Sequence, residues 1–167
     1  MFGLVTEEQL PIDAIDDDRL ARLYEYWDSR RNGAAMPARS DVDPLDLREH
    51  IGRIHLIEVI DGERFQYRVY GSRIANPDGV DMTGRFASDY QDTAFAEMTI
   101  RHYRICVVQA APVLHHVVGV IEHRPFEFKR LCLPLSQNDA GVGMILAAPV
   151  RLVVPRNLPR TSNFETT

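Results

Sequence analysis

The most restrictive feature of this sequence is a hairpin signal that lies before the longest predicted helix. Residues 53–60 are rich in β-branched side chains, and the turn pair Asp61-Gly62 follows them. Residues 64–70 then alternate apolar and polar side chains, as a half-buried strand requires. We therefore predict a two-stranded hairpin in the first half of the chain.

The second half of the chain predicts a long helix and then three strands. Residues 91–109 form the helix, which Pro112 ends, and Glu97 faces Arg101 as an i,i+4 ion pair on the solvent side. The apolar stripe of this helix consists of Phe95, Met98, His102, Ile105 and Cys106. The three strands are predicted at about 113–121, 125–135 and 141–153.

Two helices are predicted ahead of the hairpin. Residues 17–32 form the first, with an aspartate among residues 16–18 as its cap and Gly33 at its end. Asp43 and Pro44 open a short second helix that reaches about His50. The apolar stripe of the first helix consists of Leu20, Leu23, Tyr24 and Trp27. That stripe must be buried, either on the open face of the sheet or against the same helix of a second subunit in a homodimer.

This order of elements predicts an α+β fold. Five antiparallel strands, with helices inserted between the second and the third, place the helices on one face of the sheet, and a flanking helix precedes them. The predicted organisation is an N-terminal segment (1–16), flanking helices (17–50), a core domain (51–154) and a flexible C-terminal tail (155–167).

Charge and hydropathy exclude several classes of protein. The net charge is -5 and the pI is about 5.6, without a basic stripe, so we expect no nucleic-acid partner. The chain offers neither a signal peptide nor an unbroken apolar stretch of membrane-spanning length, so we expect a cytoplasmic protein without membrane insertion. Cys106 and Cys132 fit a reducing compartment as small buried groups.

Several short motifs resemble one family. They are Tyr26-Trp27, the run from Pro37 to Pro44, Ile54-His55-Leu56, the run from Arg64 to Gly71, Thr83-Gly84, the run from Lys129 to Ser136, and the run from Met144 to Ala148. With these motifs the chain resembles the stand-alone PAS-like proteins found mainly in alphaproteobacteria, over about residues 20–153. The resemblance implies a sheet-and-helix shell around a pocket for a small molecule. PAS domains carry haem, flavins, small acids or no ligand, and many act by pairing, so the signal would pass through a partner protein or a dimer.

A candidate ligand pocket follows from the predicted strand and helix faces. Its residues are Phe65, Tyr67, Val69, Phe95, Met98 and His102. His102 resembles the haem ligand of haem-binding PAS sensors, and the alternative is a core histidine with one hydrogen-bonded ring nitrogen. The cofactor of the protein is therefore left as unknown. No metal site is predicted, because His102 and Cys106 are too few ligands for zinc, and His115 and His116 point to opposite faces of a strand.

The run from Arg39 to Asp43 is a candidate for a loop that meets a ligand or partner. Arg39, Asp41 and Asp43 could present an arginine–carboxylate set, but capping and loop stabilisation explain the same residues, with Asp43 as a helix cap and Arg39 bridged to Asp41 or Asp43. We favour the structural explanation.

The sequence contains no catalytic motif of the serine hydrolases, the zinc proteases or the P-loop proteins. We therefore predict a sensory or regulatory domain that binds a small ligand or a signalling partner and is not an enzyme. The first alternative is a ligand-free interaction or dimerisation module. The second is a small cone-shaped α+β enzyme.

Overall fold

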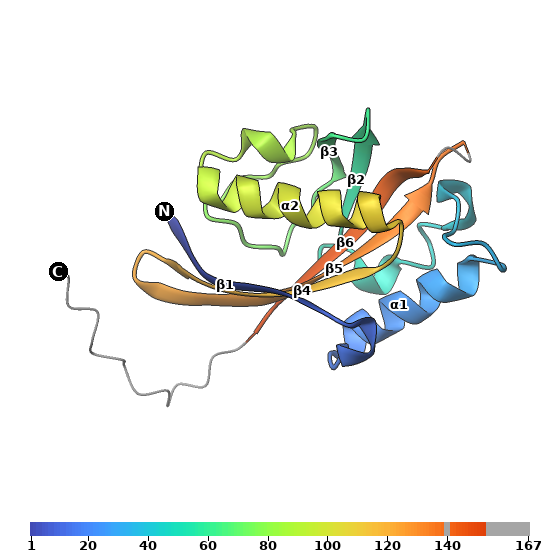
Figure 1. The fold of residues 1–167 in the computed structure, drawn as a ribbon, viewed down its shortest axis with the longest axis horizontal. Helices are drawn as coiled ribbons and strands as arrows, with labels where there is room; N and C mark the ends of the chain where they lie inside the picture. Colours follow the sequence, from blue (N-terminus) through green and yellow to red (C-terminus); the bar gives the residue numbers. More distant parts are fainter. Residues whose placement is uncertain (139–140, 153–167) are drawn as a thin grey trace.

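The chain folds around a six-stranded antiparallel sheet with a long helix against each face (Figure 1). The computed structural model describes residues 1–138 and 141–152. The strands are β1 (Phe2–Leu10), β2 (His55–Ile60), β3 (Arg64–Val69), β4 (Val113–Ile121), β5 (Arg124–Ser136) and β6 (Val142–Arg151). The helices are α1 (Asp18–Arg30) and α2 (Thr93–Gln109), with 3₁₀ turns η1 (Ile12–Ala14), η2 (Arg39–Asp41), η3 (Arg48–His50) and η4 (Ala87–Asp89).

The order of strands across the sheet is β1-β4-β5-β6-β2-β3. The five predicted strands are all present, and the α+β prediction is confirmed. The sixth strand, β1, lies in the segment that the sequence analysis left outside the core, and it pairs with β4 from Phe2 to Leu10. Its pattern is hard to read because Phe2 is its only buried side chain and a register shift between Leu4 and Thr6 interrupts the alternation.

The predicted hairpin is confirmed as β2 and β3. Asp61 and Gly62 both adopt positive φ angles, 54° and 71°, which is the backbone that the turn pair predicts. The pairing of β2 with β6 joins the hairpin to the rest of the sheet.

Helix α2 packs on one face of the sheet and is confirmed close to its predicted bounds. The Asp92 carboxylate accepts a hydrogen bond from the Phe95 N–H at 3.1 Å and caps its start. The helix ends at Gln109 as predicted, where Ala110 turns into the left-handed region (φ 48°) two residues ahead of Pro112. The predicted pair of Arg101 with Glu97 is wrong as the main contact, because Arg101 instead binds Glu7 of β1 at 2.6 Å.

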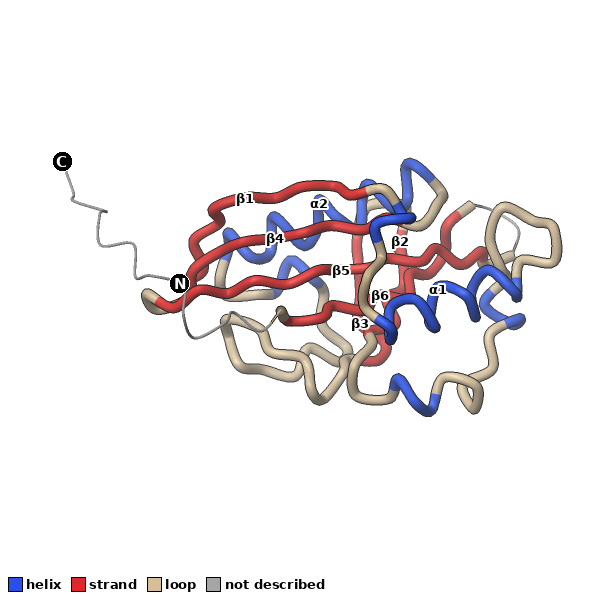
Figure 2. The backbone as a smooth tube through the Cα atoms, turned by 90° about the horizontal axis from the view of Figure 1, so that it is seen from below, coloured by secondary structure: helices blue, strands red, loops and turns tan. Residues whose placement is uncertain are grey.

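Helix α1 packs on the opposite face of the sheet, as Figure 2 shows. Leu20, Leu23 and Trp27 are buried there, and the Trp27 indole N–H donates to the Pro134 carbonyl at 2.8 Å. Tyr24 is half-buried and stacks on Trp27. The stripe is therefore filled within one chain, on the open face of the sheet, which is the first of the two predicted alternatives. It corrects the assignment of these residues to a dimer interface.

The second predicted flanking helix is wrong. Residues 43–50 form successive i→i+3 turns, including Asp46 N–H to Asp43 C=O at 3.0 Å, and end in η3. Leu45 is 72% exposed, so the segment buries too little apolar surface to stabilise a full α-helix.

In residues 1–138 and 141–152 we find no helix of the length and apolarity that a bilayer crossing needs. The predicted tail, residues 155–167, lies outside the described residues.

Candidate ligand-binding site

A cavity of about 370 Å³ lies where β6 extends beyond the start of β2. β2 pairs with β6 only from Met144 to Ala147, whereas β5 pairs with β6 as far as Arg151. Residues 148–151 therefore line an opening between the sheet and the loops around it. The remaining lining residues come from α1, from residues 50–55, from residues 70–75, and from α2, β5 and the segment before α2.

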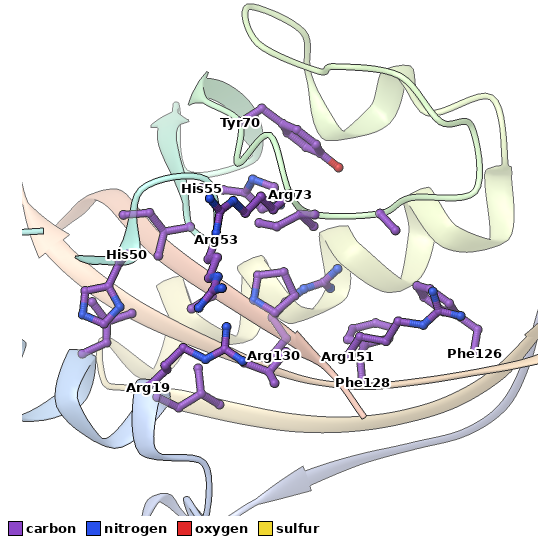
Figure 3. Close-up of a pocket in the computed structure, with 18 of the residues that line it drawn as sticks. Arg19, His50, Arg53, His55, Tyr70, Arg73, Phe126, Phe128, Arg130 and Arg151 are labelled. Carbon is purple, nitrogen blue, oxygen red and sulfur yellow. The ribbon is translucent and has the colours of Figure 1, made fainter. Parts of the chain in front are cut away.

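Positive charge distinguishes this cavity from the rest of an acidic chain. Its lining contains five arginines, Arg19, Arg53, Arg73, Arg130 and Arg151, and two histidines, His50 and His55. Figure 3 shows Arg19 and Arg53 reaching toward the same space from different segments. Within the described residues, no Asp or Glu lines the cavity, and none forms an ion pair with any of these five arginines.

Arg130 is the buried member of this set, at 4% exposure. Its guanidinium donates to His102 Nδ1 at 2.8 Å and to Thr99 Oγ1 at 3.2 Å, while its Nε has no partner among the described residues. A guanidinium carries five N–H donors, so two protein bonds leave three donors unused. Three aromatic rings surround the charge at 5.2–5.9 Å, those of Phe95, Tyr103 and Phe128.

A pair of stacked histidines lies behind Arg130. The His102 and His115 rings are parallel, with centroids 3.7 Å apart. Because arginine can only donate, His102 Nδ1 accepts and the ring proton resides on Nε2. Nε2 lies 3.3 Å from Glu7 Oε2, although the two atoms are not aligned for a hydrogen bond. Arg130 is thus connected through His102 to β1.

Burial keeps these imidazoles neutral. Desolvation, with the charge of Arg130 adding to it, lowers the pKa of His102 far below its usual range and that of His115 to about 4. The same two causes, in the same order, lower the pKa of His55. His55 Nδ1 accepts from the Gly71 N–H at 3.0 Å, so its proton is on Nε2.

A chain of tyrosine hydroxyls forms a further wall. The hydroxyl of Tyr67 lies 3.0 Å from that of Tyr103 and 3.1 Å from that of Tyr90, and Tyr90 lies 2.9 Å from Tyr70. Asn76 donates to Tyr70 at 2.9 Å. Burial raises the pKa of all four phenols, so they act as neutral hydrogen-bonding groups. Of the four, Tyr70 and Tyr90 line the cavity.

Of the six predicted pocket residues, only one lines the cavity. Phe95 lines the cavity, and His102 lies directly behind Arg130. Phe65, Tyr67 and Met98 are buried in the core beside it, and Val69 is half-exposed on the hairpin. Arg130 was not among the predicted site residues, and its place in β5 is the signal that could have identified it. It follows Phe126 and Phe128 at every second position, so it points to the same apolar face.

The predicted loop residues make structural contacts. Asp41 accepts from the Ala38 N–H at 3.0 Å, and Asp43 accepts from the Leu45 N–H at 2.9 Å. Arg39 donates to the Val42 carbonyl at 3.1 Å rather than to either carboxylate. These bonds fix the loop, and none of the three residues lines the cavity.

The observed contacts do not fit a haem bound through His102. One ring nitrogen accepts from Arg130 and the other lies beside Glu7, so neither is directed into the cavity. In the part of the chain that the structure describes, no cluster of His, Cys, Asp or Glu has the composition of a metal site.

Comparison with known proteins agrees with this architecture. The chain matches the PAS domain family over residues 15–147, which is most of its length. It therefore belongs to the PAS domain family, whose members are sensory and regulatory domains in general. No curated protein and no solved structure gives a match.

Proposed function

We propose that this PAS domain senses a small molecule held in the arginine-lined cavity and does not act chemically on it. The observation that carries the proposal is the cavity itself. It is already formed, and one volume contacts α1, the sheet and the loop before α2. Small-molecule sites are typically preformed concavities of this size, with a few polar groups in an apolar wall.

Helix α1 is the proposed route of the signal. Arg19, Leu20 and Leu23 line the cavity, so a ligand touches the helix that lies on the other face of the sheet. If α1 can adopt two placements on the sheet, a ligand that binds one of them more tightly shifts the equilibrium toward that placement. A signalling protein would then recognise the position of α1.

The side chains at this site favour binding over catalysis. Of the titratable side chains that line the cavity, burial lowers the pKa of His50 and His55 and raises the pKa of Tyr70 and Tyr90. Groups with such pKa values stay neutral near pH 7 and are poorly placed to exchange protons.

A metabolite library, screened by thermal unfolding, tests the proposal. A ligand present at about 100 times its Kd adds about 2.7 kcal/mol, which raises the Tm of a domain of this size by roughly 5–10 °C. The variant Ala75→Trp, which narrows the cavity, should abolish the shift, whereas Ala35→Trp, at an exposed alanine away from it, should not. Trp27 is the only tryptophan and lies on α1, so its fluorescence should change on binding. No shift with any compound contradicts the proposal.

Self-association is a second candidate function, and β1 favours it. β1 pairs only with β4 within the described residues, and Leu4 and Val5 are 39% and 59% exposed. A second copy could add its own β1 to this edge and form a homodimer. Light scattering should then show a dimer that Val5→Lys converts to a monomer, and a monomeric wild type contradicts this candidate.

A further inference from the structure

We propose that the ligand of the cavity is an organic dianion, with one acid group on Arg130 and a second facing the outer arginines. The inference rests on the proposed function, because it names the chemical class of ligand for the same site.

Arg130 carries a buried charge that binds no carboxylate among the described residues. A buried guanidinium remains ionised, and burying a charge without a counter-charge is unfavourable. The side chains that bind it, His102 and Thr99, are neutral, and the rings around it supply only a partial compensation. Arg130 lines the wall of the cavity, with 4% of its surface exposed. A carboxylate or phosphate there would supply the missing counter-charge and accept the unused N–H donors.

Three further arginines of the cavity lining are less buried than Arg130. Arg19 and Arg53 are half-buried and Arg73 is exposed, and none of them has a carboxylate partner among the described residues. Elsewhere the chain pairs its arginines readily, as with Arg22 and Glu49 or Arg30 and Asp46. Three unpaired cations at one opening repel one another, so a second negative group bound there is favoured.

Much of the remaining cavity wall is apolar. Phe95, Phe126 and Phe128 line the cavity on the α2 side, and Leu20, Leu23 and Ile54 line it on the α1 side. An apolar wall between two cationic ends selects a ligand whose acid groups are separated by a hydrocarbon or aromatic body. A bare inorganic anion would leave this wall without contacts.

The experiment compares matched acids and amides by isothermal titration. The probes are glutarate, adipate and phthalate, the neutral adipamide, the monoacid hexanoate, and inorganic phosphate. We expect the diacids to bind, with adipamide and hexanoate at least tenfold weaker, and inorganic phosphate weakest of all. Tighter binding by phosphate than by any diacid overturns the dianion assignment in favour of a plain oxyanion site.

The arginine variants locate the binding. Arg130→Gln should weaken the best diacid by about 30-fold or more, because removing one partner of a buried charged contact costs affinity of that order. Arg53→Gln should weaken it by about fivefold, as for a partly screened charge. Arg104→Gln, an exposed arginine of α2 that does not line the cavity, is the control with the same loss of charge and should leave affinity unchanged. Far-UV circular dichroism shows whether each variant is folded. If Arg130→Gln does not fold, Arg53→Gln still tests the proposal.

The outcomes separate the two proposals. A neutral library compound that shifts the Tm, with a binding constant that Arg130→Gln and Arg53→Gln leave unchanged, overturns the dianion and leaves the sensor intact. If Arg104→Gln weakens diacid binding and the two cavity variants do not, the diacid binds outside this cavity and the assignment is overturned. If neither the probes nor the library bind, both proposals fail.

Discussion

The two faces of the central sheet both bury an apolar core but differ in the polar groups that they bury. On the α1 face, Leu20, Leu23 and Trp27 pack against a layer of leucines, and the one buried polar group of the helix, the Trp27 indole, has its hydrogen bond. The α2 face buries an arginine, two stacked histidines and a chain of tyrosine hydroxyls. The three buried side-chain atoms that lack a partner among the described residues all lie on it, in His102, His115 and Arg130.

Strand β5 contributes side chains to both faces of the sheet. In β5, Leu131, Leu133 and Leu135 point to α1, whereas Phe128 and Arg130 point to α2. Buried apolar surface stabilises a fold, while buried polar groups with unused donors do so poorly and instead mark places where something else binds. Both faces bury an apolar core, and among the described residues the α2 face holds in addition a buried charge without a carboxylate partner.

The largest expected effect tests the α1 face. Trp27→Ala should lower the free energy of unfolding by about 3–5 kcal/mol, because it leaves a large cavity and removes the hydrogen bond to Pro134. Urea unfolding measures the loss. Val108→Ala, at an apolar side chain of α2 that is 78% exposed, is the control and should stay within about 0.5 kcal/mol of wild type. Similar losses of unfolding free energy for the two variants would contradict the claim that the packing of Trp27 against the sheet stabilises the fold.

The next effect is the response of the α2 face to pH. Burial lowers the pKa of His115 to about 4 and that of His102 further, whereas an unfolded histidine titrates near 6.5. The unfolded chain thus binds more protons below about pH 6.5, so stability is present above that pH and is lost as the pH falls toward 4. The loss should be about 1 kcal/mol per pH unit for each histidine.

Urea titrations at pH 7.5 and at pH 5 measure this dependence. The variant His115→Gln should reduce the slope, since it removes one imidazole of the stacked pair formed by His102 and His115. An unchanged slope in that variant would mean that other groups carry the pH dependence.

A smaller effect concerns the tyrosine chain. Tyr67→Phe removes the hydroxyl that meets both Tyr90 and Tyr103, and it should cost about 1–2 kcal/mol because their hydroxyls stay buried with fewer partners. Tyr24→Phe removes a hydroxyl from a half-buried tyrosine of α1 and is the matched control. Equal changes for the two variants would show that the chain of hydroxyls adds nothing to stability.

Regular patterns allowed most of the fold to be predicted. The alternation of β3, the Asp61-Gly62 turn and the aspartate cap of α1, which is Asp17, are local signals, and the structure confirms all three. β1 could not be found in this way, since only Phe2 is buried along it.

The site was harder to predict than the fold because its charges are distant in sequence. Arg19, Arg53, Arg73 and Arg130 come from four segments that only the folded sheet brings together. Net charge gave the opposite indication, because the acidic residues lie elsewhere on the chain. The one readable signal was Arg130 at an inward position of β5, between apolar neighbours on the same face.

The most direct test of the account is the free energy of unfolding of Arg130→Met, measured without ligand. Among the described residues Arg130 binds two neutral side chains and no carboxylate. Replacing it with an apolar side chain of similar length removes an unbalanced buried charge, and this offsets the hydrogen bonds that His102 and Thr99 lose, so stability should change by less than about 1 kcal/mol or should increase. A loss of about 3 kcal/mol or more would mean that Arg130 belongs to the supporting core, and the claim that the α2 face is kept for a ligand would be contradicted.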